Sequence, residues 1–170
     1  MNKIYFFTAT ILKWIQILRD DKYKDIVIES LIFLINEKRV RLYSFVIMPN
    51  HIHLVWQILE PHILPDVQRD FLKFTAQNIK LKMQKENKLF LNKFLVNSAD
   101  RKFQIWQRKP LSVELFTEKV IEQKINYIHA NPCREKWNLC KYAHEYRYSS
   151  ARFYYDGFDE WGLFKDLKYY

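Results

Sequence analysis

Glycine is almost absent from this chain, with 2 glycines among 170 residues. The loops that hold nucleotide phosphates on backbone amides need several glycines at fixed spacings. The sequence contains neither a P-loop motif nor a dinucleotide-binding fingerprint. Enzymes that depend on either loop are therefore excluded.

Cysteine and long apolar runs are also scarce. Cys133 and Cys140 are separated by six residues, which fits neither a CxxC redox pair nor a zinc ribbon. We expect two reduced thiols, since cytosolic disulfides are rare. No apolar stretch approaches the roughly 20 residues of a membrane span, and the apolar run over residues 4–12 lacks the cleavage pattern of a signal peptide. These absences predict a cytoplasmic protein with no membrane partner.

Positive charge is in excess. The chain has 28 Lys and Arg against 19 Asp and Glu, a formal net charge of +9, and 49% of its residues are hydrophobic. This length and composition suit one compact domain. Fixed positive charge attracts phosphate groups. By charge alone, nucleic acid is the first candidate for a partner and an anionic membrane surface is the second. We expect the nucleic acid and no membrane partner.

Hydrophobic periodicity predicts an α+β fold. Helices are expected over residues 22–38, 65–85 and 117–131, strands over 4–12, 40–48, 51–58 and 103–107, and a loop over 86–102. The order strand, helix, strand, strand, helix, strand, helix matches the ferredoxin-like split βαβ arrangement. We expect an antiparallel sheet with helices on one face, plus a C-terminal helical extension.

Two histidines occupy alternate positions of the predicted strand over residues 51–58. Side chains at alternate positions project from the same face about 6.6 Å apart, two rises of roughly 3.3 Å. His51 and His53 can therefore converge on one divalent metal ion, because neutral imidazole is a good metal ligand. The spacing alone leaves a hydrogen-bonded or exposed pair equally open.

Tyr127 and Asn131 lie four residues apart near the end of the third predicted helix, so they share one helix face. A phenol can attack phosphorus if a cation neutralises the developing charge. The side-chain carbonyl of Asn131 is a plausible third metal ligand beside two imidazoles. A packing tyrosine is the alternative interpretation, since the chain has 11 tyrosines.

The chain resembles the single-tyrosine HUH transposases, and within them the REP-associated tyrosine transposases. The resemblance covers nearly the whole chain and rests on ordered blocks. They are Tyr5–Thr10, Val46–Val55, Phe71–Thr75, Trp106–Gln107, Tyr127–Pro132 and Tyr146–Ala151. Asparagine at position 131, where insertion-sequence relatives carry glutamine, favours the REP-associated branch.

This resemblance implies that residues 1–132 form a catalytic domain and that 133–170 are an extension packed on it. His51, His53 and Asn131 would bind Mg²⁺ or Mn²⁺, and Tyr127 would be the nucleophile. The implied activity is nicking and strand transfer of single-stranded DNA at a hairpin, through a 5′-phosphotyrosine link. The family includes monomers and homodimers, so both states stay open.

The chain departs from the family pattern in two places. After Asn131-Pro132 the family commonly continues with valine and a glycine-containing turn, whereas this chain has Cys133-Arg134-Glu135-Lys136-Trp137. The geometry of this turn is therefore left open. The sequence Arg108-Lys109-Pro110 is also atypical, and it leaves the contacts of the fourth strand open.

Further basic residues are candidates for phosphate contacts, with solvated surface charge as the alternative. They are Arg39, Arg41, Lys73, Lys80 and Arg108. Two other functions remain open. A noncatalytic nucleic-acid-binding module could use the same kind of sheet. A small metallohydrolase could use the histidine pair to activate water, and it would not need Tyr127.

Overall fold

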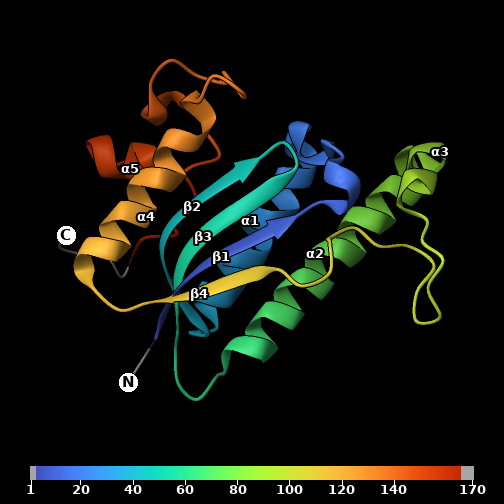
Figure 1. Cartoon of the computed structure of the whole chain (residues 1–170), viewed down its shortest axis with the longest axis horizontal. Coiled ribbons are helices and arrows are strands. Elements are labelled where there is room, and N and C mark those ends of the chain that lie inside the picture. The colour runs from blue at the N-terminus through green and yellow to red at the C-terminus, as the bar shows by residue number, and fades with distance from the viewer. Residues whose placement is uncertain (1–2, 166–170) are drawn as a thin grey trace.

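A four-stranded antiparallel sheet forms the centre of the protein. The computed structural model describes residues 3–165 (Figure 1). The strands are β1 (Ile4–Thr10), β2 (Val40–Met48), β3 (His51–Ile58) and β4 (Leu111–Leu115), in the order β2-β3-β1-β4. Helix α1 (Asp21–Asn36) joins β1 to β2, and α2 (Leu64–Glu86) lies between β3 and β4. The predicted ferredoxin-like α+β class is confirmed.

The helices lie on both faces of the sheet. Helix α2 packs on the face of β3 that carries Trp56, whose ring centroid is 5.7 Å from that of Phe71. Helix α4 (Glu118–Ala130) lies on the opposite face, where the ring centroid of Tyr127 is 5.4 Å from that of His53. The expectation of helices on one face therefore holds for α1 and α2 only. Val55 explains the difference: this apolar residue of the histidine face is fully buried and requires a cover.

Local sequence signals set the bounds of the elements. The Pro49-Asn50 turn joins β2 to β3, and both strands have the predicted ends. The side chain of Thr117 accepts a hydrogen bond from the backbone of Val120 and caps α4. Helix α4 ends at Ala130, followed by a short 3-10 turn that contains Pro132.

The fourth strand is not where the sequence predicts it. Residues 103–107 form only isolated bridges, such as that between Ile11 and Trp106, and β4 begins at Leu111. The indole nitrogen of Trp106 donates to Thr75 Oγ1 at 2.9 Å. This bond ties the segment to α2, while backbone bonds from Leu12 N to Ile105 O and from Gln107 N to Thr10 O, each 2.7 Å, tie it to the end of β1.

The predicted loop over 86–102 contains helical structure. Helix α3 (Lys88–Leu91) is followed by a 3-10 turn over Asn92–Phe94. The side chain of Asn87 accepts from the backbone of Phe90 at 3.0 Å, which provides an N-cap. Leu91 and Phe94 are buried, so apolar contacts stabilise a segment whose composition is mostly polar.

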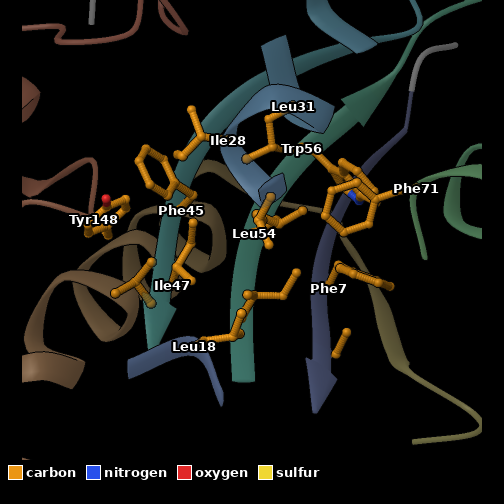
Figure 2. Close-up of a cluster of buried hydrophobic side chains, with 14 of the residues drawn as sticks. Phe7, Leu18, Ile28, Leu31, Phe45, Ile47, Leu54, Trp56, Phe71 and Tyr148 are labelled. Carbon is orange, nitrogen blue, oxygen red and sulfur yellow. The ribbon is translucent and has the colours of Figure 1, made fainter. Parts of the chain in front are cut away.

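The main core lies between the sheet and α1 and α2 (Figure 2). Phe7 of β1 is fully buried. Its ring centroid is 5.1 Å from that of Trp56 and 6.2 Å from that of Phe71. These aromatic contacts join the central strands to α2.

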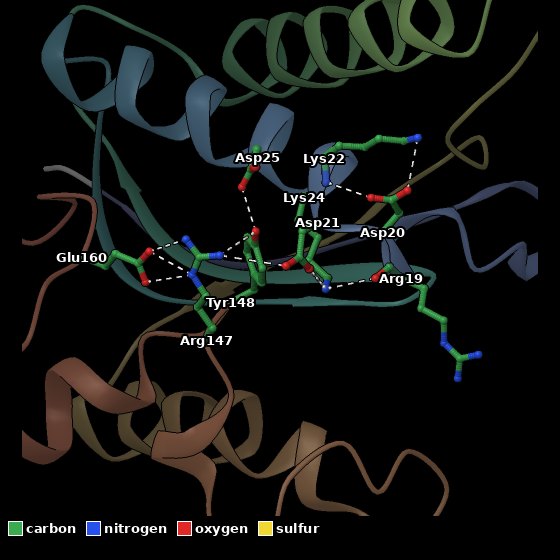
Figure 3. A network of polar contacts seen from close by, with 9 residues as sticks. All are labelled: Arg19, Asp20, Asp21, Lys22, Lys24, Asp25, Arg147, Tyr148 and Glu160. Atoms are coloured by element: carbon green, nitrogen blue, oxygen red, sulfur yellow. Dashed lines mark hydrogen bonds and ion pairs between the residues drawn. The ribbon is translucent and has the colours of Figure 1, made fainter. Parts of the chain in front are cut away.

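The segment that follows α4 packs on α1 and β2 through polar contacts (Figure 3). The hydroxyl of Tyr148 donates to Asp25 Oδ1 at 2.8 Å, and the ammonium of Lys24 lies 4.5 Å from the Tyr148 ring centroid. Ser149 forms a backbone bridge with Val46 of β2. Helix α5 (Ala151–Asp156) follows. The division at residue 132 stays a prediction, and residues 166–170 lie outside the described part.

Within residues 3–165, no helix has the length and apolar character needed to cross a bilayer.

Replacing Phe7 by alanine is expected to destabilise the protein by about 3–5 kcal/mol, because it leaves a cavity among aromatic rings. Urea unfolding measures this change. The matched control is Phe116→Ala, since Phe116 is 82% exposed, and its effect should stay within about 0.5 kcal/mol. Equal losses in the two variants would contradict this description of the core.

Candidate active site

His51 and His53 project together from the central strand β3. Their ring centroids are 4.7 Å apart. The register of the sheet places Thr10 opposite His51 and Thr8 opposite His53 on β1. The structure therefore brings the two histidines together on one face, as the alternation of the strand predicts.

Each histidine is held through its Nδ1 atom. Thr8 Oγ1 lies 2.7 Å from His53 Nδ1, and Asn50 Oδ1 lies 2.7 Å from His51 Nδ1. Asn50 donates its own amide hydrogen to the carbonyl of Trp14, which orients Oδ1 toward His51. Because Oδ1 can only accept, the His51 proton is on Nδ1 and the lone pair is on Nε2. Such partners orient metal-binding histidines.

The two imidazoles are neutral at pH 7. Burial, and then the charge of Lys136, lowers the pKa of His51 to about 4. Burial, followed by the charges of His51, Arg134 and Lys124, lowers the pKa of His53 to about 3. Neutral imidazole is the form that binds a metal ion.

Tyr127 and Asn131 complete the cluster from α4. The Tyr127 ring packs edge-on against His53 and Phe6. Tyr127, Asn131 and His51 line one cavity of about 270 Å³. Asn131 is 3% exposed, and its side-chain amide has no hydrogen-bond partner within residues 3–165. Because Asn131 lines the cavity and its side-chain oxygen is not used in a hydrogen bond, this oxygen fits the role of a ligand.

The turn after α4 adds residues that the sequence analysis left unassigned. The Arg134 guanidinium lies 4.4 Å from the Tyr127 ring centroid, and the Trp137 ring lies 5.7 Å from His51. Both residues line the cavity, together with Lys136. The turn closes through a 2.8 Å bond from the Trp137 amide to the Arg134 carbonyl. The signal that could have indicated these residues is that 133–137 differ from the glycine-containing turn of the family that the chain resembles.

Thr8 and Asn50 were also missed as parts of the site. The sequence did carry a signal for Thr8, since polar side chains at positions 8 and 10 interrupt an apolar strand. Alternation puts both threonines on one face of β1. Only the pairing of β1 with β3 shows that this face meets the histidines.

The two cysteines flank this turn. Both are free thiols, and their sulfur atoms lie 3.0 Å apart. Burial and the Cys133 contact raise the pKa of Cys140 to about 12. The Cys140 thiol is therefore protonated at neutral pH and unsuited to metal binding.

The predicted phosphate-contacting residues separate into two groups. Lys73, Lys80 and Arg108 line one groove between α2 and residues 100–110. Arg39 and Arg41 lie at the other end of the β2–β3 pair from His51, because Val40 pairs with Ile58 and Met48 with His51. Arg39 is bound to Asp70 at 2.8 Å. The structure does not bring these two arginines to the histidine site.

The fold is shared with a solved transposase structure. A REP-associated tyrosine transposase bound to a REP hairpin is similar over 94% of this chain and 83% of its own, with a TM-score of 0.68 and 18% identity. A candidate transposase from Deinococcus radiodurans is similar over 75% of this chain and 89% of its own, with a TM-score of 0.49 and 18% identity. No family model and no curated protein matches the chain. At this identity the likeness establishes the fold.

Thr8→Val is expected to weaken binding of Mn²⁺ by about 10- to 100-fold, because it removes the group that orients His53. Isothermal titration calorimetry measures the affinity. Thr8→Ser keeps the hydroxyl and should bind Mn²⁺ nearly as well as the original protein. Equal affinities for the valine and serine variants would contradict the assigned role of Thr8.

Proposed function

We propose that this protein is a transposase that nicks and rejoins single-stranded DNA through Tyr127. The supporting observation is one cavity in which Tyr127, Asn131 and His51 meet beside His53. The cations Arg134 and Lys136 line the same cavity and would attract a phosphate. The fold shared with a REP-associated tyrosine transposase supports this proposal.

The reaction follows from the groups in the cavity. The Tyr127 oxygen loses its proton and attacks the scissile phosphorus. A bond forms between the Tyr127 oxygen and the 5′-phosphate, while the bond from phosphorus to the 3′-oxygen breaks. The 3′-oxygen takes up a proton and leaves as a hydroxyl. The same hydroxyl can attack the phosphotyrosine in reverse, so rejoining needs no ATP.

A divalent cation fits this donor set. His51 and His53 offer lone pairs on neutral rings, and Asn131 offers a side-chain oxygen in the lining of the cavity. When bound, the ion would polarise the scissile phosphate as a Lewis acid. Of Mg²⁺ and Mn²⁺, the two imidazoles favour Mn²⁺, because nitrogen ligands suit first-row transition ions better.

Arg134 has a positioning role beside the nucleophile. Its guanidinium covers the Tyr127 ring at 4.4 Å from the centroid. This contact holds the phenol in the cavity and keeps a fixed positive charge close to the phosphate that it attacks.

One chain supplies all four residues of the proposed centre. His51 and His53 come from β3, Tyr127 from α4, and Asn131 from the turn that follows α4. A monomer can therefore hold a complete site, and a homodimer is not needed for it. The solved relative was bound to a REP hairpin. Hairpin-forming single-stranded repeats are accordingly the substrate class that we propose.

Tyr127→Phe should abolish the covalent protein–DNA adduct, with a loss of at least about 1,000-fold, because it removes the attacking oxygen. The assay incubates the protein with Mn²⁺ and a labelled hairpin with single-stranded flanks, followed by denaturing electrophoresis. Tyr142→Phe is the matched control, since Tyr142 is an exposed tyrosine outside the cavity. EDTA should also abolish the adduct.

Three results would contradict the proposal. An adduct that persists in Tyr127→Phe would exclude Tyr127 as the nucleophile. Binding without cleavage in Mg²⁺ or Mn²⁺ would favour a noncatalytic nucleic-acid-binding module. Cleaved products without a protein-linked intermediate would indicate a metallohydrolase.

A further inference from the structure

A second basic site lies outside the histidine cavity. It is a groove of about 540 Å³ between α2 and residues 100–110. Its lining is rich in cations: Arg69, Lys73, Lys80, Arg101, Arg108 and Lys109. Asp100 is the one carboxylate of this lining. The groove therefore carries a strong excess of positive charge.

The excess charge is concentrated on three lysines. Arg101 and Arg108 both pair with Asp100, and Arg69 pairs with carboxylates of α2. Within the described part of the chain, no carboxylate lies within 4.0 Å of the ammonium groups of Lys73, Lys80 or Lys109. These three ammonium groups are available to an anionic ligand.

The groove also contains a polar side chain that is free to bind a ligand. Gln104 lines the groove and is 9% exposed. Its backbone amide donates to the Phe94 carbonyl at 2.9 Å, whereas its side-chain amide makes no hydrogen bond within residues 3–165 and is not sealed from the groove. The side-chain oxygen accepts and the NH₂ group donates, so a ligand with both a donor and an acceptor can pair with it. The edge of an unpaired nucleic-acid base has both.

The groove meets the histidine cavity at one backbone contact. Thr10 lines the cavity and Gln107 lines the groove. The Gln107 amide donates to the Thr10 carbonyl at 2.7 Å. A strand that leaves the cavity over Thr10 therefore reaches the groove directly.

The length of the basic row along α2 suits several phosphates. Arg69 and Lys80 are 11 positions apart, which is about 16 Å along a helix. At the rise of stacked DNA, about 3.4 Å of axis per phosphate on one strand, this length corresponds to at most roughly five nucleotides, and an extended single strand places fewer phosphates along it. The row is long enough for a nucleic-acid segment and too long for a single phosphate group.

We propose that this groove binds a single DNA strand that continues from the histidine cavity. Phosphates lie on Lys73, Lys80 and Lys109, and one base is read by the Gln104 amide. A single strand is favoured over a duplex because Gln104 lies inside the groove at 9% exposure. A base must swing out of a helix to reach its amide, since the base edges of a duplex lie at the floor of the DNA grooves. That the strand in the groove is the one cut in the histidine cavity rests on the proposed function. That the groove binds a single strand does not depend on it.

The test measures DNA binding in the Tyr127→Phe background, so that no cleavage occurs. The probes are a fluorescein-labelled 20-nucleotide single strand and the corresponding 20-base-pair duplex, followed by fluorescence anisotropy across salt concentrations. The groove variant is Lys73→Gln/Lys80→Gln/Lys109→Gln. The matched control is Lys85→Gln/Lys88→Gln/Lys93→Gln, which removes the same charge from exposed lysines outside the groove.

The groove variant should bind the single strand about 10- to 100-fold more weakly. The magnitude of the slope of log affinity against log salt should fall by about 2, because each of the three lost phosphate contacts contributes roughly 0.7 on a single strand. The control should lose less than about threefold. Equal losses in the two triple variants would overturn the proposal, because net charge alone would then explain the binding.

Gln104→Ala tests base readout separately. It should weaken binding of the single strand by about tenfold and leave the duplex unchanged, whereas Gln84→Ala on the exposed side of α2 should change neither. An equal loss for the duplex would assign the groove to paired DNA and overturn the single-strand proposal. These results do not depend on catalysis, so failure of the Tyr127 adduct and failure of the groove are distinguishable.

Discussion

The antiparallel pairing of β1 with β3 at the centre of the sheet is the constraint on which the site depends. It sets Thr8 opposite His53 and Thr10 opposite His51. Alternation along β3 then sends Leu54 and Trp56 into the core and both histidines to the other face. A register shift of one residue would reverse these faces and bury the histidines among aromatic rings. Core packing and site geometry are therefore specified together.

The cover on the histidine face supplies the groups on which the proposed reaction depends. Helix α4 buries the imidazoles enough to keep them neutral, and it places Tyr127 beside them. The turn after α4 adds the cation Arg134. Burial supplies metal-binding lone pairs, while nearby cations supply attraction for phosphate. In the two proposals, the net charge of +9 would attract DNA at two places, at this cavity and along α2.

Local patterns predicted the parts of the fold that local interactions determine. Alternation predicted the common face of His51 and His53, and the spacing of Tyr127 and Asn131 predicted that the two residues meet. The strand predicted over 103–107 is reduced to isolated bridges, and its position depends on distant contacts with Thr10, Leu12 and Thr75. The partners of Thr8 and Trp137 could not be assigned from local sequence for the same reason, since His53 and His51 are distant from them along the chain.

The most direct test of the central claim is anomalous diffraction from crystals of the protein grown with Mn²⁺. We expect one strong anomalous peak within coordination distance of Nε2 of His51, Nε2 of His53 and the side-chain oxygen of Asn131. The same cavity should still contain the Tyr127 hydroxyl. Absence of a peak at this position at saturating Mn²⁺, or a peak held by other residues, would contradict the account.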